Sequence, residues 1–151
     1  MSITEEMHEE LMNHVFDSVK IAADYAEKEN EINHIYICGS YEADVTSVDA
    51  FYEVEKKIIK MDQVKGRTSD EESDLSSDLL DRISALIESF RKYKQDVPTQ
   101  IRIIYSFENE KVNYDFKYEP YWSHNDDYLD NFFEKDFFNE WRQEIENQLN
   151  S

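Results

Sequence analysis

The chain combines a strongly acidic composition with the apolar content of a folded protein. Its 151 residues include 35 acidic and 16 basic ones, which gives a formal net charge of −19, and 40% of them are hydrophobic. So large an acidic excess excludes direct binding to nucleic acid and to anionic membranes, which both need clustered cations, and it favours a basic protein partner. The aromatic content of 14% argues against disorder, so we expect one domain over residues 1–151.

Two further features bear on where the protein acts. Residues 1–10 are acidic and lack the apolar run of a signal peptide, and no stretch is apolar over the length that crosses a bilayer. The single cysteine, Cys38, cannot form an internal disulfide. These features predict a soluble protein of the cytoplasm.

Hydrophobic periodicity predicts a helix and then paired strands in the first half of the chain. Apolar residues recur at helical spacing from Met7 to Ala26, and β-branched and aromatic residues dominate 34–42. An alternating segment over 45–57 follows, and a turn near 43–47 would join the two segments as a hairpin. We therefore predict a helix over 7–26, strands over 34–42 and 45–57, and a short third strand over 57–61.

The second half echoes this order with a helix, a hairpin and a last helix. Residues 62–74 are polar, and we expect a surface loop in which acids gather before the next helix. That helix carries an apolar stripe from Leu75 to Tyr93 and ends before Pro98. We predict strands over 101–107 and 112–118, an irregular segment over 120–127 and a helix over 129–149. The predicted fold class is α+β: an antiparallel sheet of two hairpins with helices packed on one face, in the order α-ββ(β)-α-ββ-α.

The sequence contains no recognisable catalytic, cofactor or metal motif. Its two glycines cannot form a phosphate-binding loop. Cys38 lies inside a predicted strand, where a buried thiol is a better interpretation than a nucleophile. The four histidines share no ligand spacing, and the acids around Asp126 and Asp127 fit a helix cap better than a calcium loop. We therefore predict no catalytic residue, no cofactor and no metal site.

Acidic and aromatic residues gather between the last predicted strand and the last helix. Tyr121 and Trp122 fall outside a clear core stripe, so burial in the core and exposure in a binding surface are both open for them. Exposed aromatics among acids are typical of protein-binding surfaces. The predicted partner-binding residues are Glu119, Tyr121, Trp122, Asp126, Asp127 and Tyr128. A second candidate surface, in the predicted loop, consists of Asp70, Glu71, Glu72 and Asp74.

Three segments of the second half carry a resemblance to a known family. Residues 98–106 read PTQIRIIYS, residues 112–119 read VNYDFKYE, and residues 138–141 read FNEW. Together they resemble the YezG/EsaG-like antitoxin (immunity protein) family of Gram-positive bacteria, in which Pro-Thr, an apolar strand, an acidic Tyr-rich strand and a late Phe-x-x-Trp follow one another. Phe116 stands where the second strand often has Tyr. The opening hairpin agrees more loosely, so the resemblance spans about residues 32–145.

The resemblance implies a partner and a mode of action. It implies a cytoplasmic protein that binds a secreted nuclease toxin of a type VII secretion system and holds it inactive until export, with no catalytic residues of its own. The net charge independently favours such a partner, because a nuclease presents cations to phosphate and an acidic surface can occupy them. Two alternatives stay open: an acidic metal-dependent hydrolase, and an acidic scaffold or dimerisation module.

Overall fold

The structure, a computed structural model, describes residues 3–29, 31–42, 44–118 and 132–150, with only the backbone described at 3–4, 132–137 and 139. The predicted α+β class and element order are confirmed, and most element boundaries agree within a few residues. In chain order the elements are α1 (Ile3–Tyr25), β1 (Ile32–Glu42), β2 (Val45–Val54), β3 (Lys57–Lys60), the 3-10 helix η1 (Met61–Gln63), α2 (Ser69–Lys92), β4 (Gln100–Ser106), β5 (Lys111–Lys117) and α3 (Phe132–Leu149).

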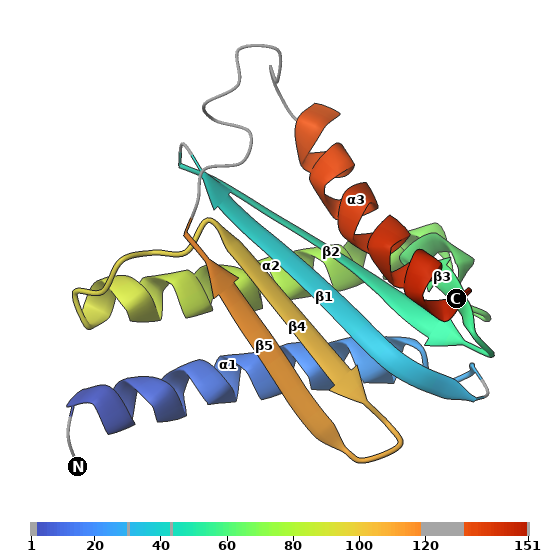
Figure 1. Ribbon diagram of the computed structural model, residues 1–151, viewed down its shortest axis with the longest axis horizontal. Helices are drawn as coiled ribbons and strands as arrows, with labels where there is room; N and C mark the ends of the chain where they lie inside the picture. The colour runs from blue at the N-terminus through green and yellow to red at the C-terminus, as the bar shows by residue number, and fades with distance from the viewer. Residues whose placement is uncertain (1–2, 30, 43, 119–131, 151) are drawn as a thin grey trace.

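The five strands form one antiparallel sheet in the order β3-β2-β1-β4-β5, with β1 at its centre (Figure 1). Ile37 on β1 lies opposite Ala50 on β2 and Ile103 on β4. Because successive side chains of a strand point to opposite faces, each strand contributes to both faces of the sheet. Every residue of β1 from Ile35 to Ser40 is buried, so both faces of the sheet are covered at its centre.

Helices α1 and α2 cover one face of the sheet and form the larger core with it (Figure 1). The buried stripes of α1 and α2 pack on alternate residues of β1, β2 and β4. Each large apolar side chain that is fully buried there stabilises the fold by about 1.5–3 kcal/mol. The Tyr52 hydroxyl crosses this core and donates to the Ala22 carbonyl oxygen at 2.8 Å. The fully buried members with large side chains include Val15, Leu79, Ile83, Leu86, Ile35, Ile37, Tyr52, Ile101 and Ile103.

Helix α3 lies on the opposite face, which corrects the prediction that all helices pack on one face. Its Phe138, Trp141 and Ile145 bury against the second set of β1 and β2 side chains, which are Tyr36, Cys38 and Phe51. The rings of Tyr36 and Phe51 stack with centroids 4.9 Å apart, and the Trp141 ring meets both edge-on at 5.7 and 5.3 Å. If all three helices packed on one face, these apolar side chains would be exposed to water. Packing of α3 on the opposite face buries them and removes the free-energy cost of that exposure.

Candidate partner-binding surface

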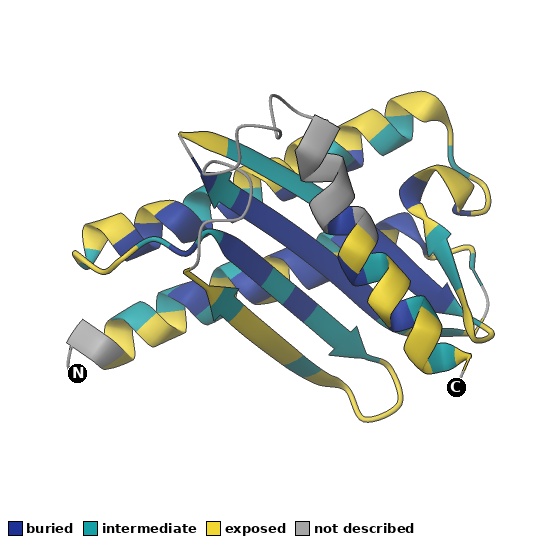
Figure 2. Cartoon of the chain, turned by 45° about the horizontal axis from the view of Figure 1, so that its top comes forward, coloured by how far each residue is buried: buried dark blue, intermediate teal, exposed yellow. Residues whose placement is uncertain are grey.

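The helix layer formed by α1 and α2 carries much of the acidic excess. These two helices contain 13 of the 35 acidic residues and only 4 of the 16 basic ones. Figure 2 shows a buried stripe on each helix toward the sheet and exposed residues on the outward side. Since the apolar residues occupy the stripe toward the sheet, the charged residues concentrate on the outer surface.

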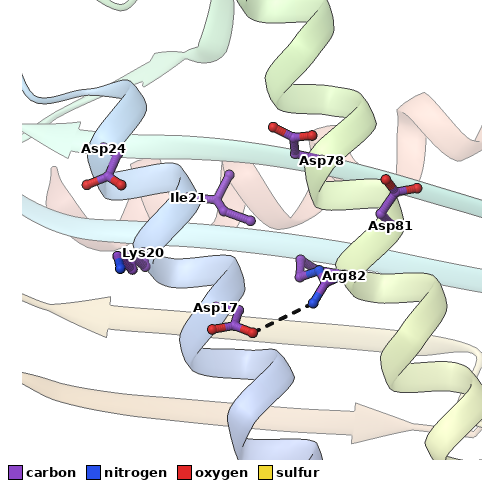
Figure 3. A pocket seen from close by; sticks show the side chains of 7 residues that line it. All are labelled: Asp17, Lys20, Ile21, Asp24, Asp78, Asp81 and Arg82. Carbon is purple, nitrogen blue, oxygen red and sulfur yellow. Dashed lines mark ion pairs between the residues drawn. The ribbon is translucent and has the colours of Figure 1, made fainter.

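The two helices enclose an acidic groove on this outer surface (Figure 3). Its first part has a volume of about 410 Å³ and lies between Asp17 and Asp24 of α1 and Asp78 and Asp81 of α2. A second hollow of about 340 Å³ shares Asp24, Asp78 and the apolar Ile21 with the first, so the two are continuous. We define the acidic groove by its six carboxylates, which are Asp17, Asp24, Glu71, Asp74, Asp78 and Asp81.

Three basic residues also line the groove, and two of them are engaged with its carboxylates. An Arg82 nitrogen lies 3.6 Å from an Asp17 oxygen, the pair drawn in Figure 3. Arg67 donates to Glu71 at 2.6 Å, and this hydrogen bond lowers the pKa of the Glu71 carboxyl. The third basic residue is Lys20.

Four of the six groove carboxylates have no ion-pair partner among the described residues. Within the described ranges, Asp24, Asp74, Asp78 and Asp81 take part in no ion pair, and all four are exposed. The groove therefore keeps an excess of negative charge that would attract a cationic side chain.

Local sequence explains why α2 presents its acids as a stripe. The Thr68 hydroxyl accepts a hydrogen bond from the Glu71 backbone N–H at 3.2 Å, and the Glu71 carboxylate accepts from the Thr68 backbone N–H at 3.1 Å. This capping box satisfies two orphan donors and starts the helix at Ser69. Four of the acids then follow at helical spacing of three, four and three residues: Glu71, Asp74, Asp78 and Asp81.

The predicted second candidate surface is in this helix and not in a loop. Asp70, Glu71, Glu72 and Asp74 all lie in the first two turns of α2, because the capping box starts the helix at Ser69, six residues before Leu75. Glu71 and Asp74 line the acidic groove, whereas Asp70 and Glu72 do not. The first candidate surface, which consists of Glu119, Tyr121, Trp122, Asp126, Asp127 and Tyr128, lies outside the described residues.

Four groove residues escaped the sequence analysis: Asp17, Asp24, Asp78 and Asp81. A signal for two of them was present, because Asp78 and Asp81 continue the helical repeat of Glu71 and Asp74 one residue before Leu79 and two before Ile83. The repeat would have placed four carboxylates on one face of the helix. The sequence contains no pattern that predicts α1 and α2 to lie side by side. Asp17 and Asp24 could therefore be assigned to the groove only from the structure.

Two features that bear on metal binding and on nucleophilic chemistry can be stated for the described part of the chain. Among its residues, no group of three or more His, Cys, Asp or Glu side chains is arranged to hold a metal ion. Cys38 is fully buried under α3, and burial raises the pKa of its thiol well above the ordinary value. A thiol held in its neutral form is a poor nucleophile.

Comparisons with known proteins leave the resemblance as a prediction. No protein-family model matches the chain, and no curated protein matches it. None of the helices in the described ranges has the length and apolar character of a membrane-spanning segment. The acidic groove is therefore interpreted from its own geometry and charge.

Proposed function

We propose that this protein binds a basic protein toxin, of the nuclease class, and holds it inactive in the cytoplasm. The observation that carries the proposal is a group of exposed aspartates in the acidic groove that form no ion pair with any described residue: Asp24, Asp74, Asp78 and Asp81. The family resemblance of residues 32–145 supports the class of partner. The net charge of −19 supports the sign of the interaction.

The physical argument concerns the phosphate-binding surface of a nuclease. Such a surface must be cationic, so an acidic protein is steered toward it and can occupy it in place of nucleic acid. The groove offers carboxylates at its rim and the apolar Ile21 between them. Lysine and arginine side chains suit this combination, because their stems are apolar and only their tips are charged.

The first experiment is a pull-down from the native host with this protein as bait, at low and at high salt. We expect capture of a basic nuclease domain, weakened as salt rises because screening removes the steering. The captured nuclease is then assayed for cleavage with and without added protein, and cleavage should stop at a stoichiometric ratio. Recovery of no basic partner, or of one that still cleaves when bound, would refute the proposal.

A paired set of variants tests whether the acidic groove is the surface used. The test variant is Asp78→Asn with Asp81→Asn, and the matched control is Glu108→Gln with Glu110→Gln in the exposed turn before β5, which removes the same charge elsewhere. Exposed charges act mainly on the association rate, so we expect the test variant to bind about threefold to tenfold more slowly and the control to bind nearly as the parent does. Equal slowing in both would show that only the total charge matters.

A third variant tests the surface predicted from the sequence. Trp122→Ala lies outside the described residues, and the prediction is that Trp122 acts as an aromatic anchor. We expect its loss to increase the dissociation rate without changing the salt dependence. An unchanged dissociation rate would remove Trp122 from the proposed interface and leave the acidic groove as the candidate.

A further inference from the structure

Strand β5 is an exposed edge that no strand of the described part covers. It ends the sheet order after β4, so its outer side presents backbone groups that could pair with another strand. Five of its seven residues are exposed, including Lys111, Asn113, Tyr114 and Asp115. An edge of this kind accepts an added strand when the side chains permit it.

The other edge, β3, is protected against pairing with a copy of itself. Its sequence reads Lys57-Ile58-Ile59-Lys60, so a strand of only four residues has a lysine at each end. Short edge strands and lysines on an edge both discourage pairing with another chain. This is how natural edge strands avoid association.

The charges on β5 have a different arrangement, which is self-complementary. Lys111 and Asp115 are four residues apart on the same face of the strand. When two copies pair antiparallel about Asn113, Lys111 of each lies opposite Asp115 of the other, and Val112 lies opposite Tyr114. The register centred on Tyr114 would instead place Lys111 opposite Lys117, so the charges favour the register centred on Asn113 over that one.

We propose that two copies of this chain pair through β5, antiparallel and centred on Asn113, to give a symmetric dimer with one continuous sheet. The two-fold symmetry makes every cross-strand contact occur twice. Opposite charges and an aromatic–β-branched pair are both favourable cross-strand combinations. The occupant of the edge is therefore a second copy of the chain.

The hairpin that contains this edge carries balanced charge, which lessens the repulsion between two copies at the strand. Residues 100–117 contain three acidic and three basic residues, whereas α1 and α2 together are strongly negative. Two chains of −19 repel at long range, but this repulsion is screened by salt while contacts at the pairing distance are screened much less.

The pairing would also cover aromatic surface on the strand itself, where Tyr114 is 40% exposed. In both views α1 passes behind β5 and extends beyond its outer edge, so in the two-fold dimer the α1 helices of the two copies would meet behind the paired strands (Figures 1 and 2). Covering exposed aromatic surface favours association.

The test uses the full chain and charge reversal. Mass is measured by light scattering and sedimentation from micromolar to millimolar concentration, and the expected dimer has twice the 18.1 kDa of one chain. Lys111→Asp and Asp115→Lys each create two like-charge contacts, so each alone should give a monomer. The double variant Lys111→Asp/Asp115→Lys restores both contacts and should dimerise again, as should a mixture of the two single variants. Lys117→Asp makes the same charge change outside the complementary pairs and should leave the dimer intact.

The outcomes separate this inference from the proposed function. We expect dimerisation to strengthen as salt rises, whereas binding of a basic toxin should weaken. A mass of one chain at every concentration overturns the inference and leaves toxin binding unaffected. A dimer that persists in both single-charge variants also overturns it, because the pairing would then lie elsewhere.

Discussion

At Gly39 the sheet and the helix layer approach each other closely, and replacing this residue by alanine tests that packing directly. Gly39 lies on the central strand β1, and a Cβ placed there would be 2.9 Å from Ile83 Cγ2 of α2, with two further Ile83 carbons at 3.3 and 3.4 Å. Real Cβ atoms essentially never approach another heavy atom this closely. Ile83 is fully buried, so its side chain has no open space to enter.

The expected cost of Gly39→Ala is that of overpacking a core. Inserting one methyl group into a tightly packed site costs about 1–3 kcal/mol of unfolding free energy. Without the contact, alanine would be favoured over glycine by about 0.4–1 kcal/mol, because it has less freedom to lose on folding. The two contributions have opposite sign, and the contact at 2.9 Å makes the first the larger. We expect a net loss of about 1–2 kcal/mol, or roughly 2–8 °C in melting temperature for a chain of this length.

The assay is urea denaturation of the parent, the two single variants and the double variant Gly39→Ala/Ile83→Ala. Ile83→Ala alone should cost about 2–5 kcal/mol, as large-to-small core substitutions do. In the double variant the alanine at residue 39 no longer meets the Ile83 side chain. The double variant should therefore lose less stability than the sum of the losses in the two single variants. A Gly39→Ala variant as stable as the parent, or losses that are additive, would refute the packing argument.

Three further substitutions test the electrostatics of β2, the second core and the end of α1. Burial raises the pKa of the Asp49 carboxyl, so its ionised form disfavours folding. Asp49→Asn should therefore increase the free energy of unfolding at neutral pH. In urea titrations this increase should vanish as pH falls toward about 3.9, the pKa of an aspartate in the unfolded chain. Trp141→Ala removes the ring packed on Tyr36 and Phe51 and should cost about 3–5 kcal/mol in the same assay, with a smaller loss contradicting the assigned role of α3. Arg67 donates to the carbonyl oxygens of Tyr25 and Asp24 at the end of α1, so Arg67→Met should cost about 1–3 kcal/mol and speed amide exchange in the last turn of that helix; unchanged exchange would contradict this.

The hairpins could be predicted because their side chains alternate and their turns are polar. Ile101, Ile103 and Tyr105 alternate along β4 with the side chains that face α3, and the paired strands β4 and β5 follow within a few residues of the predicted ranges. The position of α3 was missed because the prediction considered one apolar set per strand. The run Ile35–Ser40 is apolar or small throughout, and such a run is typical of a strand buried on both faces.

The candidate surface was predicted only in part, and the reason is the start of α2. The segment Thr68-x-x-Glu71 is the pattern of a capping box, and it precedes an apolar repeat. With that pattern recognised, Glu71 and Asp74 would have been placed in the helix and extended to Asp78 and Asp81. The contribution of α1 depends on how two helices pack against each other, which hydrophobic periodicity alone does not specify.

The two proposals use different parts of the molecule, and together they predict a stoichiometry. The acidic groove lies between α1 and α2, whereas the proposed dimer contact lies at the outer side of β5. The acidic groove lies on the outer side of the helix layer, away from the sheet, so we expect a dimer paired through β5 to present two equivalent binding surfaces. A saturated complex should therefore contain two copies of this chain and two toxin domains, and the charge-reversal variant Lys111→Asp should reduce it to one of each without loss of inhibition. Loss of inhibition together with loss of the dimer would show that the toxin contacts both chains at once.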